Sequence, residues 1–184
     1  MTDKKIIIGL AGEICAGKGA IVKYLENKYG AASYRFSSML RDLLNRLYLP
    51  VSRKNMQNIS TAIRQYMGED ILAKVIAEDV QKDKNNIVVV DGIRRVPDIK
   101  YLHEVPGFKL VRVMAEPETR FKRLILRKEN AGDENKSYEQ FLQDHKKEAD
   151  AQVPTVMAEA DLEIDNNVSL ADLYKQVDQI VLNS

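Results

Sequence analysis

Two patterns of apolar residues alternate along this chain. Short apolar runs with the length of buried strands lie near residues 5–10, 33–36, 87–90, 108–114 and 162–164. Between them, apolar residues recur at spacings of three and four, as at Leu40, Leu43, Leu44 and Leu47, which is the period of an amphipathic helix. Strands that alternate with helices in this way predict an α/β fold with a parallel sheet.

Small polar residues before the helical stretches predict where the helices begin. The expected N-caps are Ser37 or Ser38, Asp70, Ser137 and Ser169. Ser137 and Gln140 together have the spacing of a capping box, which predicts a helix through about residue 150. The polar stretch 128–136 contains a glycine and no apolar repeat, so it is expected to be a mobile loop.

Composition narrows the class of protein. With 184 residues the chain is expected to form one domain, and its net charge of +1 gives no field that would attract nucleic acid. A single cysteine cannot form an internal disulfide, which fits the reducing cytoplasm. No apolar run approaches the length of a membrane span. We therefore expect a cytoplasmic protein, a monomer or small homo-oligomer, whose partners are small molecules rather than nucleic acid or membrane.

The first apolar run leads into a loop bounded by glycines. The loop reads Gly12-Glu13-Ile14-Cys15-Ala16-Gly17-Lys18-Gly19, and a helical stretch begins at Ala20. A strand, a glycine-bounded loop ending in Gly-Lys, and a helix together predict a P-loop. In such a loop the backbone N–H groups surround a phosphate, and Lys18 is expected to reach the β- and γ-phosphates. The alternative is a glycine-rich turn with a surface lysine.

The end of this loop departs from the usual pattern. A Ser or Thr normally follows the lysine and binds Mg²⁺ through its hydroxyl, but here Gly19 and Ala20 follow. Mg²⁺ would then take its ligands from phosphates, water and a carboxylate, which it tolerates because it readily keeps several waters.

A second polar landmark follows the apolar run at 87–90. It reads Asp91-Gly92-Ile93-Arg94-Arg95. Ligands of open α/β sheets bind outside the carboxyl ends of the strands, so Asp91 is expected to lie near the P-loop and to hold Mg²⁺. Arg94 or Arg95 could grip a phosphate, and the sequence leaves open which of them does.

With both landmarks placed, the chain resembles the P-loop nucleoside monophosphate kinases and their relatives, the deoxynucleotide kinases and dephospho-CoA kinases. Gly17-Lys18-Gly19 is similar to the P-loop ending of adenylate kinases. The resemblance implies a three-layer α/β/α fold with a five-stranded parallel sheet of order 2-3-1-4-5. It also implies a single domain over 1–184, with an acceptor-binding insert at about 37–80 and a short lid at about 128–137.

The resemblance assigns further residues to the two substrates. Ser37 and Arg41 match the segment that opens the acceptor-binding helix, and Arg64 lies in a segment similar to one of deoxynucleotide kinases. Gly92, Arg94 and Arg95 match the Asp-Gly-x-x-Arg element of the family, also on the acceptor side.

The helix that enters the lid contains Arg120, Arg123 and Arg127 on one face. The family places phosphate-binding arginines there, which implies that Arg123 binds ATP and Arg127 acts in catalysis. A solvated basic stripe is the alternative for each.

These assignments give a mechanism of phosphoryl transfer that depends on alignment and positive charge. The expected catalytic residues are Lys18, Asp91 and Arg127, and the expected cofactors are ATP and Mg²⁺, with Asp91 as the metal ligand. The leading hypothesis is transfer of the ATP γ-phosphoryl to a nucleoside or deoxynucleoside monophosphate. The alternatives are a dephospho-CoA kinase and a regulatory NTPase with no small-molecule acceptor.

Overall fold

The apolar runs pair side by side into one parallel sheet. The computed structural model describes residues 5–127, 135–144 and 151–183. The strands of this described part are β1 (Ile6–Ala11), β2 (Ala32–Arg35), β3 (Ile87–Ile93), β4 (Phe108–Met114) and β5 (Leu162–Asp165). Their order across the sheet is β2-β3-β1-β4-β5, and every pairing is parallel. The predicted order 2-3-1-4-5 is confirmed.

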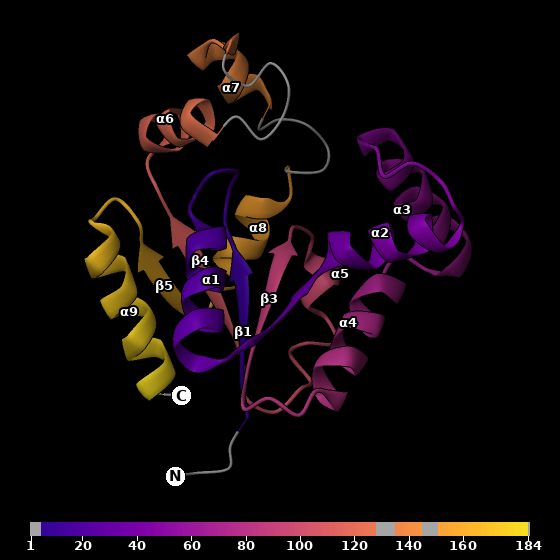
Figure 1. Ribbon diagram of the computed structural model, residues 1–184, viewed down its shortest axis with the longest axis horizontal. Coiled ribbons are helices and arrows are strands. Elements are labelled where there is room, and N and C mark those ends of the chain that lie inside the picture. Colours follow the sequence, from indigo (N-terminus) through magenta and orange to yellow (C-terminus); the bar gives the residue numbers. More distant parts are fainter. Residues whose placement is uncertain (1–4, 128–134, 145–150, 184) are drawn as a thin grey trace.

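Helices cover both faces of this sheet (Figure 1). The helices are α1 (Lys18–Tyr29), α2 (Phe36–Arg46), α3 (Arg53–Met67), α4 (Ile71–Lys82), α5 (Val96–Ile99), α6 (Pro117–Arg127), α7 (Tyr138–Asp144), α8 (Val153–Ala158) and α9 (Leu170–Leu182). Successive side chains of a strand point to opposite faces. Ile8 and Val89 accordingly pack with α1 and α9, whereas Ile7 and Val88 pack with α2, α4, α5 and α8. The predicted three-layer arrangement is confirmed.

Several helix ends differ from the capping pattern. Ser37 and Ser38 lie inside α2, which begins at Phe36 directly after β2, so the expected cap is wrong. Asp70 stands at the N-cap position of α4, but its carboxylate accepts hydrogen bonds from Lys100 and Tyr101 instead of capping the helix. At Asp70, contacts with residues after β3 thus replace the local capping bond.

Two other expected starts are confirmed. Ser137 and Gln140 form the reciprocal hydrogen bonds of a capping box before α7, and the Ser169 hydroxyl accepts from the Asp172 N–H at the start of α9. Residues 145–150, where the first of these helices was expected to continue, lie outside the described residues. The short helix α8 was not expected from the sequence.

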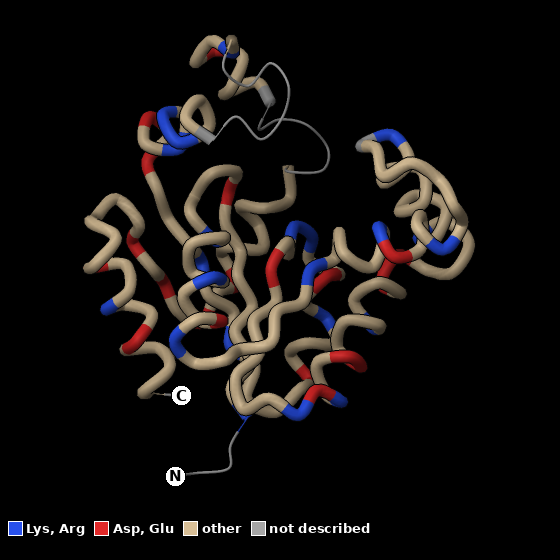
Figure 2. Tube along the Cα trace, in the orientation of Figure 1, with Lys and Arg blue, Asp and Glu red and all other residues tan. Residues whose placement is uncertain are grey.

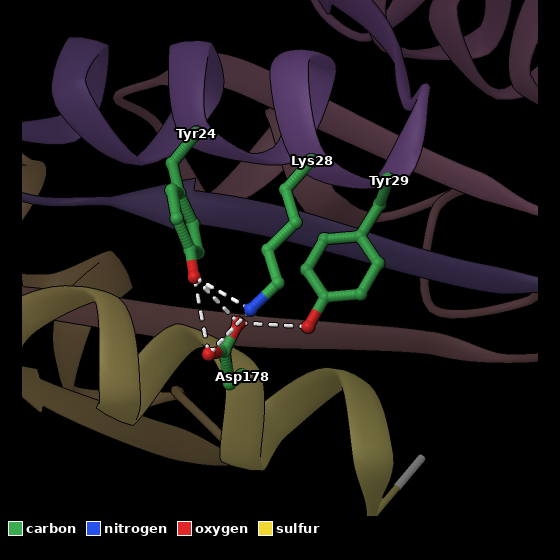
Figure 3. Close-up of polar contacts among 4 residues, drawn as sticks. All are labelled: Tyr24, Lys28, Tyr29 and Asp178. Atoms are coloured by element: carbon green, nitrogen blue, oxygen red, sulfur yellow. Dashed lines mark hydrogen bonds and ion pairs between the residues drawn. The ribbon is translucent and has the colours of Figure 1, made fainter.

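A polar cluster ties α9 to α1 (Figure 3). The Asp178 carboxylate accepts hydrogen bonds from the hydroxyls of Tyr24 and Tyr29 and from the Lys28 ammonium, at 2.9, 2.7 and 2.7 Å. The hydrogen bond from Lys28 is the main cause that lowers the pKa of Asp178, against an opposing effect of burial. Because α1 follows the P-loop and α9 follows β5, this cluster fixes two elements that flank the candidate site.

Aromatic contacts join α6 and α7 beyond the carboxyl ends of the strands (Figure 1). Phe121 of α6 lies 5.4 Å from Tyr138 and 5.5 Å from Phe141, measured between ring centroids. These two helices border the predicted lid, of which residues 128–134 lie outside the described residues. None of the helices within the described part is both long and apolar enough to traverse a bilayer.

Candidate functional site

The P-loop, residues 12–19, connects the carboxyl end of β1 to α1. Cys15 and Gly17 have positive φ angles of 59° and 104°, which turn the chain sharply into the helix. The first amides of α1 have no partner within the helix, and they stand at the positive end of its dipole. The backbone of this loop therefore has the form of an anion-binding site.

Lys18 folds back over the loop that precedes it. Its ammonium donates to the carbonyl oxygens of Gly12 at 2.5 Å and Glu13 at 3.1 Å. The only positive side chain of the loop thus lies against the segment that would surround a phosphate. It remains the predicted catalytic lysine.

Asn166, in the turn after β5, holds the backbone of the P-loop. Its side-chain amide is buried and donates to the Ala16 carbonyl at 2.6 Å. A Cβ atom on Gly17 would lie 1.9 Å from this amide nitrogen, so the close approach requires glycine at that position. Sequence reasoning did not single out Asn166. Its only signal was its place just after the last strand.

Two arginines of α6 also reach the P-loop. Arg123 donates to the carbonyl oxygens of Asn166 at 2.8 Å and Ala16 at 3.4 Å. Arg120 is buried and forms an ion pair with Glu13, with 3.0 Å between Nη2 and Oε2. Arg123, which was predicted to bind ATP, therefore lies beside the P-loop. The pairing of Glu13 with Arg120 was not predicted.

Asp91 lies at the same edge of the sheet as the P-loop because β3 and β1 are neighbours. Its carboxylate accepts from the Gly92 N–H at 2.7 Å and pairs with Arg35 of β2 at 2.9 Å. Arg35 is a further residue that the sequence did not single out. Its signal would have been its position at the carboxyl end of a strand.

Magnesium binding by Asp91 stays a prediction, and one carboxylate at this edge is compatible with it. Within the described residues, no three His, Cys, Asp or Glu side chains converge as a metal site. A single carboxylate suits Mg²⁺, which completes its shell with phosphate oxygens and water. A Cβ atom at Gly19 would meet nothing within 4 Å, so packing does not exclude a hydroxyl residue there.

The predicted acceptor residues fall into two environments. Arg41 is exposed on α2 and donates to the Ser37 hydroxyl at 3.2 Å. Arg64 is only 8% exposed, and its guanidinium pairs with Asp98 at 3.1 Å. Both stay predictions as acceptor ligands, but only Arg41 stands free of the protein interior.

Asp98 organises the turn that holds Arg94 and Arg95. Its carboxylate accepts from the backbone N–H groups of both arginines, at 3.1 and 3.0 Å. The Arg94 side chain is exposed, whereas Arg95 is half-buried and lies 3.8 Å from Glu69. The buried carboxylate of Asp98 thus holds the backbone of the turn after β3 through hydrogen bonds.

Arg127 is the last residue of α6, and its side chain lies outside the described part of the chain. Figure 2 shows that segments containing Lys and Arg occur on α6 and just after β3, above the carboxyl ends of the central strands. A separate hollow of about 500 Å³ is bordered by α5 residues and by Lys100 and Glu159, and includes no P-loop residue.

Comparison with known proteins places these features in a family. Residues 11–141, from the end of β1 into α7, match the AAA domain family. The UPF0200 protein of Staphylothermus marinus is 30% identical over 172 residues, which cover 94% of this chain and 89% of that protein. The UPF0200 protein of Thermococcus onnurineus is 30% identical over 181 residues, covering 96% and 95%. The chain belongs to the AAA domain family and to the UPF0200 family.

Solved structures show which fold this UPF0200 chain has. It resembles shikimate kinase from Bacteroides thetaiotaomicron with a TM-score of 0.63 at 14% identity, over 96% of this chain and 98% of that one. Shikimate kinase from Acinetobacter baumannii, in complex with shikimate, gives a TM-score of 0.58 at 18% identity, over 98% and 95%. The fold is that of the P-loop kinases, as the sequence predicted.

Proposed function

We propose that this chain is an ATP-dependent phosphotransferase that moves the γ-phosphoryl group of ATP to a nucleoside or deoxynucleoside monophosphate. The observation that carries the proposal is the meeting of the P-loop and Asp91 on neighbouring strand ends. Phosphoryl transfer needs alignment and positive charge more than covalent chemistry, and this edge of the sheet supplies both.

On the donor side, the backbone amides of residues 12–19 hold the triphosphate. Lys18 exchanges its carbonyl contacts for phosphate oxygens and stabilises the negative charge that spreads over the transferred group. Asp91 would hold Mg²⁺, which would neutralise charge on the phosphates when bound. Arg123 lies at the base of the loop, and Arg127 is assigned to the lid side of the transferred group.

On the acceptor side, the charge of one segment supports an anionic substrate. The acceptor arm, defined as α2, α3 and their connection over residues 36–67, contains five basic side chains and one acidic one. Its net charge is therefore +4, whereas the whole chain has +1. The basic residues are Arg41, Arg46, Arg53, Lys54 and Arg64, and the acidic one is Asp42. A monophosphate acceptor matches this sign, with Arg41 and Arg94 as its exposed ligands.

The test is an assay with ATP, Mg²⁺ and a panel of acceptors. The panel contains the common nucleoside and deoxynucleoside monophosphates, dephospho-CoA and shikimate, and both ADP and phosphorylated product are measured. We expect product from a monophosphate in the wild type and almost none in Lys18→Ala. Product from dephospho-CoA or shikimate alone would replace the proposed acceptor, and ADP without product would indicate a hydrolase.

A further inference from the structure

Glu13 is a carboxylate in the middle of an anion-binding loop. A negative charge there repels the triphosphate that the loop is proposed to hold, and this repulsion is not screened well at short range. The side chain is nevertheless compatible with the loop because it turns toward α6 and meets a positive partner.

That partner, Arg120, is held at several points. Its guanidinium is 3% exposed and lies 3.0 Å from the Glu13 carboxylate. Its Nε donates to the Ala115 carbonyl at 3.0 Å, just before α6. Its guanidinium carbon lies 5.5 Å from the centre of the Phe141 ring, on α7. One side chain therefore contacts the P-loop, the end of β4 and the helix that follows the lid.

The two residues depend on each other because the Arg120 side chain is buried, at 3% exposed, and its partner Glu13 is half-buried, at 33%. A guanidinium taken out of water is costly unless a carboxylate and hydrogen bonds compensate it. Glu13 supplies that compensation, and in return Arg120 cancels the charge that would oppose a phosphate. Arg123, three residues further along α6, differs because it donates to the carbonyl oxygens of Ala16 and Asn166.

We propose that Arg120 is a positioning residue for the donor nucleotide. It neutralises the charge of Glu13 in the P-loop, and it is not a phosphate ligand. This inference rests on the donor half of the proposed function, namely ATP binding by the P-loop. It concerns affinity for ATP and does not depend on which acceptor the enzyme uses.

The test is a double-mutant cycle on the full chain with Arg120→Met, Glu13→Gln and both changes together. ATP affinity is measured by titration calorimetry with Mg²⁺, and the melting temperature of each variant is recorded. We expect Arg120→Met to weaken ATP binding by at least about tenfold, because Glu13 is left uncompensated beside the phosphates. Adding Glu13→Gln should restore the affinity to within about threefold of the wild type.

A phosphate ligand would behave differently. If Arg120 bound phosphate, Glu13→Gln could not restore the affinity, and the double variant would bind as weakly as Arg120→Met. That outcome overturns the proposal, and so does an Arg120→Met variant that binds ATP as the wild type does.

The double variant separates a loss of ATP affinity from a loss of folding. Removing both charges leaves no buried ion unpaired, so the double variant is expected to fold even where Arg120→Met does not. A double variant that fails to fold, or that binds ATP more than about tenfold more weakly than the wild type, contradicts the proposal. The matched control is the exposed pair of Arg112 and Glu163, 2.6 Å apart on β4 and β5. Arg112→Met and Glu163→Gln make the same charge changes, and neither should alter ATP affinity.

The outcome is separable from that of the phosphotransferase proposal. If the wild type binds ATP but phosphorylates no acceptor, the proposed reaction is contradicted, and the double-mutant cycle can still be measured through ATP affinity. A wild type that binds no ATP would end both.

Discussion

The P-loop and the acceptor arm differ in how firmly their side chains are held. Around the P-loop, Asn166 is 4% exposed and Arg120 3%, and both contact the loop from other elements. On the acceptor arm, Tyr48 is 90% exposed and Tyr66 80%. One region is preorganised by the rest of the fold, whereas the other projects side chains into solvent.

This difference matches the tasks proposed for the two regions. A triphosphate is bound through backbone amides whose geometry must be fixed in advance, because preorganisation reduces the cost of binding. An acceptor that must enter and leave is better bound by side chains that solvent and ligand can reach. The four changes below test this comparison, in order of decreasing expected effect.

Arg64→Met breaks the buried ion pair that joins α3 of the acceptor arm to Asp98 of α5. It leaves the Asp98 carboxylate without its guanidinium, and removing one partner of a buried pair costs about 3–5 kcal/mol of stability. The free energy of unfolding in urea is the measurement. Arg112→Met, in the exposed pair with Glu163, is the control and should cost less than about 1 kcal/mol.

The same variant decides between two roles for Arg64. A loss of stability indicates that the residue holds the turn of Arg94 and Arg95 through Asp98. Unchanged stability with a raised KM for the acceptor would instead support the role that the sequence predicted, a direct acceptor ligand.

Lys18→Ala removes the ammonium group from the P-loop. We expect kcat to fall by roughly 10²–10³, the usual effect of removing one preorganised donor that stabilises transition-state charge. The melting temperature should stay close to that of the wild type, because the hydrogen bonds of Lys18 to Gly12 and Glu13 lie within its own loop. Steady-state kinetics with the best acceptor is the measurement, and an unchanged kcat would remove Lys18 from the mechanism.

Arg41→Gln tests the exposed side of the acceptor arm. Loss of a charge-assisted contact to a phosphate should raise the KM for the acceptor by about tenfold and leave the KM for ATP unchanged. Arg46→Gln is the matched control on the same helix. Equal effects of the two variants would mean that the arm attracts its acceptor by overall charge and not through Arg41.

Asp178→Asn tests the cluster that joins α1 to α9. The pKa of Asp178 is lowered in the folded state, chiefly by its hydrogen bond with Lys28, so its contribution to stability is present above its ordinary value of 3.8. That contribution is lost as the pH falls through the lowered pKa. At pH 7 we expect the melting temperature of the variant to be lower by ~2 °C.

The dependence of the melting temperature on pH shows whether the cluster acts through the charge of Asp178. The curves of wild type and variant should begin to converge below the ordinary value of 3.8 and should meet once the pH has fallen through the lowered pKa, where the folded wild-type carboxylate becomes protonated. A difference that persists unchanged at pH 2 would show that the cluster acts through packing, for example through the stacked rings of Tyr24 and Tyr174, and not through charge.

Interactions between distant segments were less predictable from the sequence than local ones. The capping box of Ser137 and Gln140 was predictable because both partners lie within one helical turn. The pairs of Arg120 with Glu13 and of Arg64 with Asp98 join residues 107 and 34 positions apart, and no local pattern marks them. The cap expected at Ser37 or Ser38 was wrong because α2 begins at Phe36, and Asp70 stands at the expected N-cap position of α4 but bonds to Lys100 and Tyr101.

By itself, the sequence determined an α/β fold with a parallel sheet and the place of the P-loop, whereas the strand order followed from the resemblance to the P-loop kinases. Apolar runs, helical spacing and glycines constrain the backbone locally, and the loop that they define binds through its backbone. Only the tertiary structure decided how each charged side chain is used: Arg120 to pair with Glu13, Arg64 to pair with Asp98, and Arg41 to stand exposed. The reason is physical. Burial and the distance to an opposite charge set the energy of an ionised group, and both are properties of the folded chain.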